Sequence, residues 1–187
     1  SMATLGAMSA VMLSGIIIAG ERSMGWTRQM RITPLGAATY VGTKVLACYL
    51  RAILVIAAMC VAGITLGVHL PAHKWAVMTG LLLAGLVPFT VLGILLGHLL
   101  TTDSSAVALA GTVMLFALLG GVYGFQLAST GTLFDIIKGI PSFWLAQAAK
   151  AALRLDNWPA EGWIVMGVWT AVLLPLAVLA YQGGTRR

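Results

Sequence analysis

The chain has 187 residues, of which 60% are hydrophobic and only 9% are charged, and its mean hydropathy is +0.98. Soluble domains carry roughly a quarter charged residues, so this composition excludes a soluble globular domain and indicates an integral membrane protein. The formal charge of +6 does not indicate nucleic-acid binding, because the basic residues gather on no large polar face.

Five apolar segments approach the length of about 20 residues that a membrane-spanning helix needs. The sequence therefore predicts one domain, an all-α bundle of five spans. In chain order, the spans are expected at about residues 2–19, 40–68, 76–100, 106–126 and 163–181. A basic segment at 21–35 follows the first span, short polar connections occupy 69–75 and 101–105, and a mixed segment at 127–162 precedes the last span.

The distribution of Lys and Arg predicts the orientation. Five of the eleven basic residues fall within one 30-residue window around segment 21–35, and Arg186 and Arg187 end the chain. Cytoplasmic flanks of membrane proteins are enriched in Lys and Arg, so we expect segment 21–35 and the C-terminus to be cytoplasmic. An odd number of spans then places the N-terminus outside, and we expect the full protein to have a further span before it.

The mixed segment 127–162 is expected to contain two short outer helices. Residues 132–137 and 142–155 have helical apolar spacing, interrupted at Gly139-Ile140-Pro141. Trp144, Trp158 and Trp163 suit the aromatic belt of a membrane interface. We expect the two helices to dip into the outer leaflet or lie along it, with protein or water covering the irregular backbone between them.

Glycine and proline residues predict features of the span packing. Three pairs are spaced as Gly-x-x-x-Gly, namely Gly63/Gly67, Gly93/Gly97 and Gly120/Gly124. Such faces let helices approach closely in lipid, although 22 glycines also produce this spacing by chance. Pro88 and Pro175 lie within spans, and we expect each to kink its helix.

The sequence contains no catalytic constellation. His69 and His73 have the i, i+4 spacing of a metal site, but Pro71 between them favours an ordinary polar connection. His98 is a candidate for a proton relay near the inner end of a span. No Gly-Lys-Ser/Thr phosphate-binding loop is present. The lack of such motifs predicts no cofactor or metal on this chain. The predicted spans also contain no Asp or Glu, which argues against a self-powered secondary transporter and implies an external source of energy.

Segment 21–35 is amphipathic and basic, and Gly20 and Pro34 bracket a helix of three to four turns. By itself this pattern fits two interpretations equally. One is an interfacial helix held by anionic lipids, and the other is a helix that docks on a soluble partner.

The residue pattern of this segment resembles the signature of ABC-2 type permeases, the membrane subunits of a class of ABC exporters. The matching positions are Glu21, Arg22, Gly25, Arg28, Gln29, Thr33, Pro34 and Leu35, followed by Tyr40 and Lys44. Looser matches are Gly120-Gly121-Val122-Tyr123 and Ile140-Pro141-x-x-Trp144. The family often has a proline after the glycine-rich end of its fifth span, where this chain has Gly124-Phe125-Gln126.

The resemblance covers essentially the whole chain and implies six spans, of which the first is absent here. It implies a permease subunit that moves a hydrophobic or amphipathic substrate (a drug, an antibiotic or a lipid-like molecule) out of the cell by alternating access. ATP and Mg²⁺ would bind to a partner ATPase subunit, and a second permease copy or a paralogue would complete the assembly in the plasma membrane.

The resemblance also implies that segment 21–35 is the coupling helix that docks on the ATPase. The docking candidates are Glu21, Arg22, Gly25, Arg28, Gln29, Arg31, Thr33 and Pro34. Tyr40, Lys44 and Arg51 are candidates for contact with anionic lipid or substrate at the inner mouth, the alternative being simple snorkelling toward the cytoplasm. The remaining alternatives for the chain are a stand-alone channel or structural membrane protein and, less favoured, a membrane-embedded enzyme.

Overall fold

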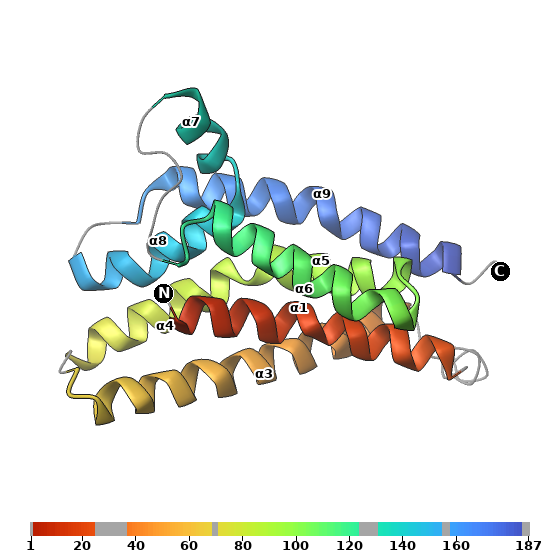
Figure 1. The fold of residues 1–187 in the computed structure, drawn as a ribbon, viewed down its shortest axis with the longest axis horizontal. Helices are drawn as coiled ribbons and strands as arrows, with labels where there is room; N and C mark the ends of the chain where they lie inside the picture. Colours follow the sequence, from red (N-terminus) through yellow and green to blue (C-terminus); the bar gives the residue numbers. More distant parts are fainter. Residues whose placement is uncertain (1, 25–36, 69–70, 124–130, 155–157, 185–187) are drawn as a thin grey trace.

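The computed structural model describes residues 2–24, 37–68, 71–123, 131–154 and 158–184. These ranges form helices and contain no strand, which confirms the predicted all-α fold (Figure 1). In chain order the helices are α1 (Met2–Ser23), α3 (Ala37–Thr65), α4 (Ala72–Gly85), α5 (Val87–Leu99), α6 (Thr102–Leu119), α7 (Thr132–Lys138), α8 (Pro141–Arg154) and α9 (Ala160–Gly184).

Four stretches within the described ranges are long and apolar enough to cross a membrane. They are Met2–Ser23, Gly42–Thr65, Ala72–Leu99 and Ala160–Ala180, and the third comprises both α4 and α5. A fifth apolar helix, α6, is shorter. Because lipid offers no hydrogen bonds to a backbone, such segments are stable in a bilayer only when their own backbone groups are paired, as they are in a helix. The chain is a multi-pass membrane protein.

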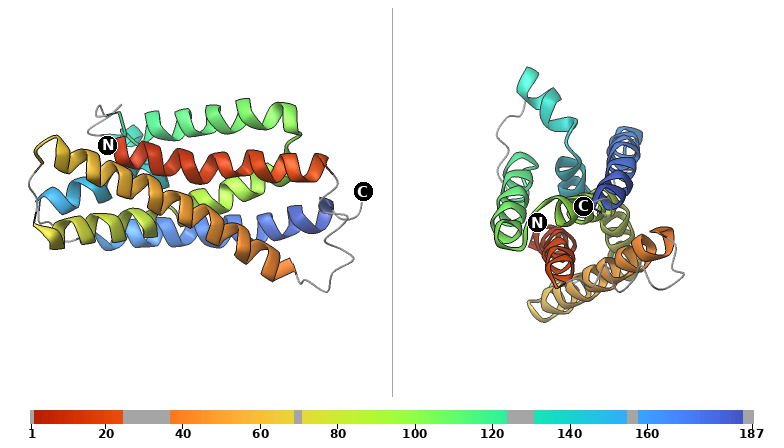
Figure 2. Two further views of the ribbon diagram at one scale, coloured as in Figure 1. Left: turned by 90° about the horizontal axis from the view of Figure 1, so that it is seen from below. Right: turned by 90° about the vertical axis from the view of Figure 1, so that its right-hand side faces the viewer.

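The helices run back and forth along one bundle axis (Figures 1 and 2). The C-terminal ends of α1, α5 and α9 lie at the same end of the bundle as the N-terminal ends of α3 and α6. We call this the Glu21 end. The N-terminal end of α1 and helix α8 lie toward the opposite end.

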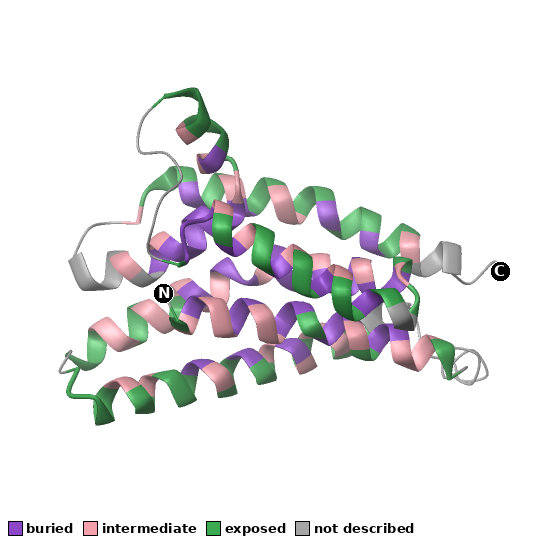
Figure 3. Ribbon diagram, viewed as in Figure 1, coloured by how far each residue is buried: buried purple, intermediate pink, exposed green. Residues whose placement is uncertain are grey.

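Helices α1 and α5 form the centre of the bundle. Helix α1 packs against α3, α5 and α6, while α5 also packs against α9, and α4 packs against α8. Their shared core includes Met8, Met12, Leu86 and Phe89, all fully buried. Helices α3 and α9 instead expose much of their apolar surface (Figure 3), as expected of helices that face lipid.

Small residues bring the backbones of α1 and α5 into contact. A Cβ atom added to Gly97 would lie 2.6 Å from the carbonyl oxygen of Gly15, and one added to Gly93 would lie 3.0 Å from the Cα atom of Met12. The predicted Gly93/Gly97 face therefore packs within this chain. Gly63 faces the indole ring of Trp75 instead, which would lie 3.1 Å from an added Cβ atom.

Pro88 coincides with a junction in the third predicted span. Helix α4 ends at Gly85 and α5 begins at Val87, with Leu86 between them in helical conformation. Pro88 has no N–H to donate to the carbonyl four residues earlier, and it is well tolerated in the first turn of a new helix. Pro175, by contrast, lies inside α9, which runs unbroken from Ala160 to Gly184.

The fourth predicted span, 106–126, is wrong at both ends. Helix α6 begins at Thr102, so most of the expected polar turn at 101–105 belongs to its first turn. It ends at Leu119, because Gly121 adopts a φ of 67° and Gly120 packs directly against the backbone of Ser142. With 18 residues, α6 is about 27 Å long and nearly matches the hydrocarbon core.

The two short helices predicted within segment 127–162 are present as α7 and α8, and the turn between them falls at Gly139 and Ile140. Their place on the outer side stays a prediction. The two helices differ in burial. Helix α7 exposes apolar side chains, whereas α8 buries nearly all of its first two turns in the bundle. Indole N–H groups cover the turn: Trp144 donates to the carbonyl of Lys138 at 2.7 Å and Trp169 donates to that of Gly139 at 2.8 Å.

Candidate functional site

The C-terminal turn of α1 carries the first two residues of the predicted docking segment. The first span was expected to end near residue 19, but α1 continues to Ser23, so Glu21 and Arg22 belong to α1. The amide of Met24 still donates to the carbonyl of Gly20 at 3.1 Å. The predicted helix start after Gly20 is therefore wrong, because α1 continues through this position.

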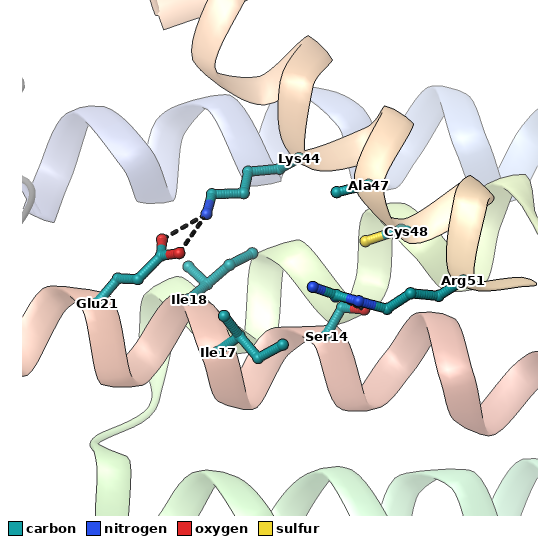
Figure 4. A pocket seen from close by; sticks show the side chains of 8 residues that line it. All are labelled: Ser14, Ile17, Ile18, Glu21, Lys44, Ala47, Cys48 and Arg51. Atoms are coloured by element: carbon teal, nitrogen blue, oxygen red, sulfur yellow. Dashed lines mark hydrogen bonds and ion pairs between the residues drawn. The ribbon is translucent and has the colours of Figure 1, made fainter.

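Glu21 forms an ion pair with Lys44 of α3. The Nζ atom of Lys44 lies 2.6 Å from Oε1 and 2.5 Å from Oε2 of Glu21 (Figure 4). The side chain of Glu21 is only 22% exposed and that of Lys44 only 20%. Partial burial reduces the screening of such a pair by water and salt, so this contact holds the end of α1 to the beginning of α3 more firmly than a surface pair does.

Arg22 caps the C-terminal end of α5. Its Nη1 atom donates to the carbonyl of His98 and lies 3.4 Å from the carbonyl oxygen of Gly97 and 3.5 Å from that of Leu100. The last carbonyls of a helix have no partner within the helix and carry partial negative charge. A guanidinium at this position both satisfies and neutralises them. Arg22 thereby joins α1 to α5.

A second polar contact joins α1 and α3 two turns deeper in the bundle. The Nη1 atom of Arg51 donates to the hydroxyl oxygen of Ser14 at 2.8 Å, and that hydroxyl donates to the carbonyl of Ala10 at 3.0 Å. Between this contact and the Glu21–Lys44 pair lies a cavity of about 50 Å³ (Figure 4). Its lining residues are Ser14, Ile17, Ile18, Glu21, Lys44, Ala47, Cys48 and Arg51.

The two contacts follow one antiparallel register. Seven residues separate Ser14 from Glu21 on α1, and seven separate Lys44 from Arg51 on α3. Seven residues are about two helical turns, so each pair of side chains lies on one helix face. We call the two contacts, Glu21–Lys44 and Ser14–Arg51, the polar rungs.

His98 lies beside the rungs at the Glu21 end. Its side chain is buried, and its Nδ1 atom lies 2.8 Å from the carbonyl oxygen of Ile94, to which it can only donate. This contact orients the ring along α5. A proton-relay role for His98 stays a prediction.

The structure brings together Glu21, Arg22, Lys44 and Arg51. Other predicted site residues lie outside the described residues, namely Gly25, Arg28, Gln29, Arg31, Thr33 and Pro34. Tyr40 lies in α3, but its side chain is likewise outside the described part. His69 of the candidate metal pair also falls outside it. No group of three or more His, Cys, Asp or Glu side chains converges among the residues described.

Sequence reasoning missed two participants. Ser14 was overlooked, although a polar residue seven positions before Glu21 matches the Lys44–Arg51 spacing and is the signal that was available. The sequence could not predict which carbonyl groups of α5 accept hydrogen bonds from Arg22. They lie 75 to 78 residues away, and every residue has a carbonyl group.

Comparison with known proteins yields a family match over nearly the whole chain. The model of a family described as "ABC-2 family transporter protein" matches residues 1–179. The "Putative transport permease YvfS" of Bacillus subtilis (strain 168) is 32% identical over 148 residues, which are 78% of this chain. The aligned part spans 60% of the length of that relative. No solved structure matches the chain.

Proposed function

This chain belongs to the ABC-2 transporter family, and we propose that it is the membrane-spanning permease of an ATP-driven exporter. In this proposal it moves a hydrophobic or amphipathic substrate, such as a drug, an antibiotic or a lipid-like molecule, out of the cell by alternating access. A separate ATPase subunit binds ATP and Mg²⁺ and supplies the energy. A second copy of the chain or a paralogue forms the other half of the pathway.

The observation that carries the mechanism is the link between α1 and α3 beside segment 25–36. This segment joins the end of α1 to the start of α3 in the sequence. The Glu21–Lys44 pair holds these two helix ends together, and Arg22 adds the end of α5. A force applied to segment 25–36 would therefore move three helices together instead of bending one of them.

Docking on the ATPase is assigned to Arg28, Gln29 and Arg31 of the proposed coupling helix, with Gly25, Thr33 and Pro34 shaping its ends. Glu21 and Arg22 have partners within the chain, so their proposed role is to pass the displacement to α3 and α5. The Glu21 end is proposed to face the cytoplasm, in line with the concentration of Lys and Arg around segment 21–35 and at the C-terminus.

Co-purification with the ATPase tests this proposal. The permease is co-expressed with a candidate ABC ATPase subunit from the same organism, and the amount of ATPase retained on the tagged permease is measured. The double variant Arg28→Glu, Arg31→Glu is expected to retain at least about tenfold less, because each reversal replaces an attraction at the contact by a repulsion.

The matched control is Lys74→Glu, Lys138→Glu, which changes the charge equally at the opposite end of the bundle. It is expected to retain the ATPase like the wild type. Equal retention by the Arg28/Arg31 variant and the wild type would refute the docking assignment. Substrate flux through permease-only vesicles that is unchanged by ATPase and ATP would instead favour a stand-alone channel.

A further inference from the structure

The cavity between α1 and α3 has a net positive charge within an apolar helix pair. Lys44 and Arg51 contribute two positive charges to its lining and Glu21 one negative charge, which leaves +1. The rest of the lining is apolar except for Ser14. A net charge inside a membrane-spanning segment is costly unless a counter-charge accompanies it.

The unbalanced charge belongs to Arg51. The carboxylate of Glu21 is paired with Lys44, and no other described carboxylate lies within ion-pair distance of the Arg51 guanidinium. A guanidinium has five N–H donors, of which one hydrogen bond goes to Ser14. Since the Ser14 hydroxyl accepts this bond and donates its own proton to Ala10, it orients the guanidinium without neutralising it.

The size and position of the cavity restrict what can supply the counter-charge. Its volume of about 50 Å³ is several times the roughly 10–15 Å³ that one water molecule needs, and is far too small for an acyl chain. Ile17 and Arg51 both line the cavity and are exposed, so the cavity is accessible from the outer surface of the helix pair. The planar fork of a guanidinium matches two oxygens of a phosphate or carboxylate group.

We propose that this cavity binds a phosphate-type oxyanion through Arg51, with Ser14 as its positioning residue and the Glu21–Lys44 pair closing the cavity toward the Glu21 end. The oxyanion is either the phosphate of an anionic lipid, whose acyl chains stay in the bilayer, or free phosphate. The site requires only α1 and α3 of this chain, so the proposal does not depend on the ATPase.

Lipid retention tests the site directly. The full chain is purified without its ATPase, incubated with equal amounts of phosphatidylglycerol and phosphatidylcholine, and analysed by native mass spectrometry. The wild type is expected to retain phosphatidylglycerol in preference to phosphatidylcholine. In Arg51→Gln this preference is expected to fall about tenfold or more. The variant loses the positive charge and the two-oxygen hydrogen bonds that favour an uncompensated phosphate over that of phosphatidylcholine, whose charge the choline ammonium neutralises.

A parallel measurement distinguishes the two sources of the oxyanion. The thermal unfolding midpoint is recorded in phosphatidylcholine alone, with and without inorganic phosphate. A rise of the midpoint in the wild type that Arg51→Gln abolishes identifies free phosphate as a ligand. Selective retention of phosphatidylglycerol with no effect of inorganic phosphate identifies the lipid.

Lys74→Gln removes one positive charge outside the cavity and serves as the matched control, expected to behave like the wild type in both measurements. Ser14→Ala is expected to weaken the preference severalfold while Arg51 remains. If Arg51→Gln fails to fold by circular dichroism and gel filtration, Arg51→Lys replaces it, since it keeps the charge but loses the two-oxygen fork. The proposal is overturned if the Arg51 variant that folds matches the wild type, or if the wild type responds to neither probe.

Discussion

The ammonium group of Lys44 contacts both carboxylate oxygens of Glu21, at 2.6 and 2.5 Å, and so joins the end of α1 to the first turns of α3. The Ser14–Arg51 contact repeats this link seven residues further along each helix. The two polar rungs fix the antiparallel register of α1 and α3, which apolar packing alone specifies weakly because lipid-facing apolar residues are interchangeable.

Replacing one member of the Glu21–Lys44 pair is expected to weaken the fold. Glu21→Gln leaves the Lys44 ammonium without its counter-charge in a position that is only 20% exposed. The free energy of unfolding is expected to fall by about 1–2 kcal/mol, between the values for exposed and buried pairs. Chemical unfolding in detergent micelles measures this change.

The exchanged pair Glu21→Lys, Lys44→Glu is the control for this prediction. It restores opposite charges across the same gap and is expected to recover most of the lost stability. Strictly additive losses in the exchanged pair would show that the two side chains do not interact.

Gly97 is expected to tolerate no side chain. In Gly97→Ala the new methyl group would lie 2.6 Å from the Gly15 carbonyl oxygen, and α1 and α5 would have to separate. We expect the unfolding free energy to fall by about 1–3 kcal/mol, as in other overpacked cores. Gly167→Ala is the control, because no atom lies within 4 Å of its added Cβ; it should be neutral or stabilise α9 by up to about 1 kcal/mol.

Arg22 is expected to protect the end of α5 from local opening. Arg22→Met removes the donor to the carbonyls of Gly97 and His98 while keeping much of the apolar stem. Loss of about 1 kcal/mol of capping energy would accelerate amide hydrogen exchange at the end of α5 about fivefold. Arg22→Lys keeps the charge and is expected to show a smaller effect. Unchanged exchange in Arg22→Met would contradict the capping role.

The indole N–H groups that cover the turn between α7 and α8 are expected to matter more than the rings themselves. Trp144→Phe leaves the carbonyl of Lys138 without its donor at a part-buried site, at a cost of about 1–3 kcal/mol. Trp169→Phe does the same to the carbonyl of Gly139, but that hydrogen bond is exposed, so its loss is expected to cost less. Trp163→Phe makes the same chemical change at a residue that is 53% exposed, and little loss is expected there. Thermal unfolding of the three variants side by side provides the comparison.

Local patterns predicted much of this fold correctly. The all-α bundle follows from apolar segments of span length, and the break at Gly139-Ile140-Pro141 follows from residues that interrupt a helix by themselves. The helix ends at Ser23 and Leu119 were missed, because distant contacts set them. Arg22 finds its partners about 75 residues away on α5, and Gly120 packs against Ser142 on α8.

The candidate site, like the fold, was predicted from the sequence only in part. Its cations were identified from the sequence, since charged residues near the ends of apolar segments stand out without any knowledge of packing. Their partners were not identified. Lys44 and Arg51 are predicted to contact anionic lipid or substrate or to snorkel toward the cytoplasm, and both alternatives stay predictions. They do not include the contacts that the structure shows, Lys44 with Glu21 and Arg51 with Ser14.

The sequence by itself determined that this protein is an integral membrane protein built from helices. Unpaired backbone groups are so costly in lipid that such apolar segments can adopt few other structures there. It also determined, through the pattern around Glu21, which family the chain resembles. Only the tertiary structure decided which polar groups meet across α1, α3 and α5. Those contacts depend on the relative register of separate helices. Hydrophobicity alone does not determine this register, whereas a few polar and small residues at the helix contacts do.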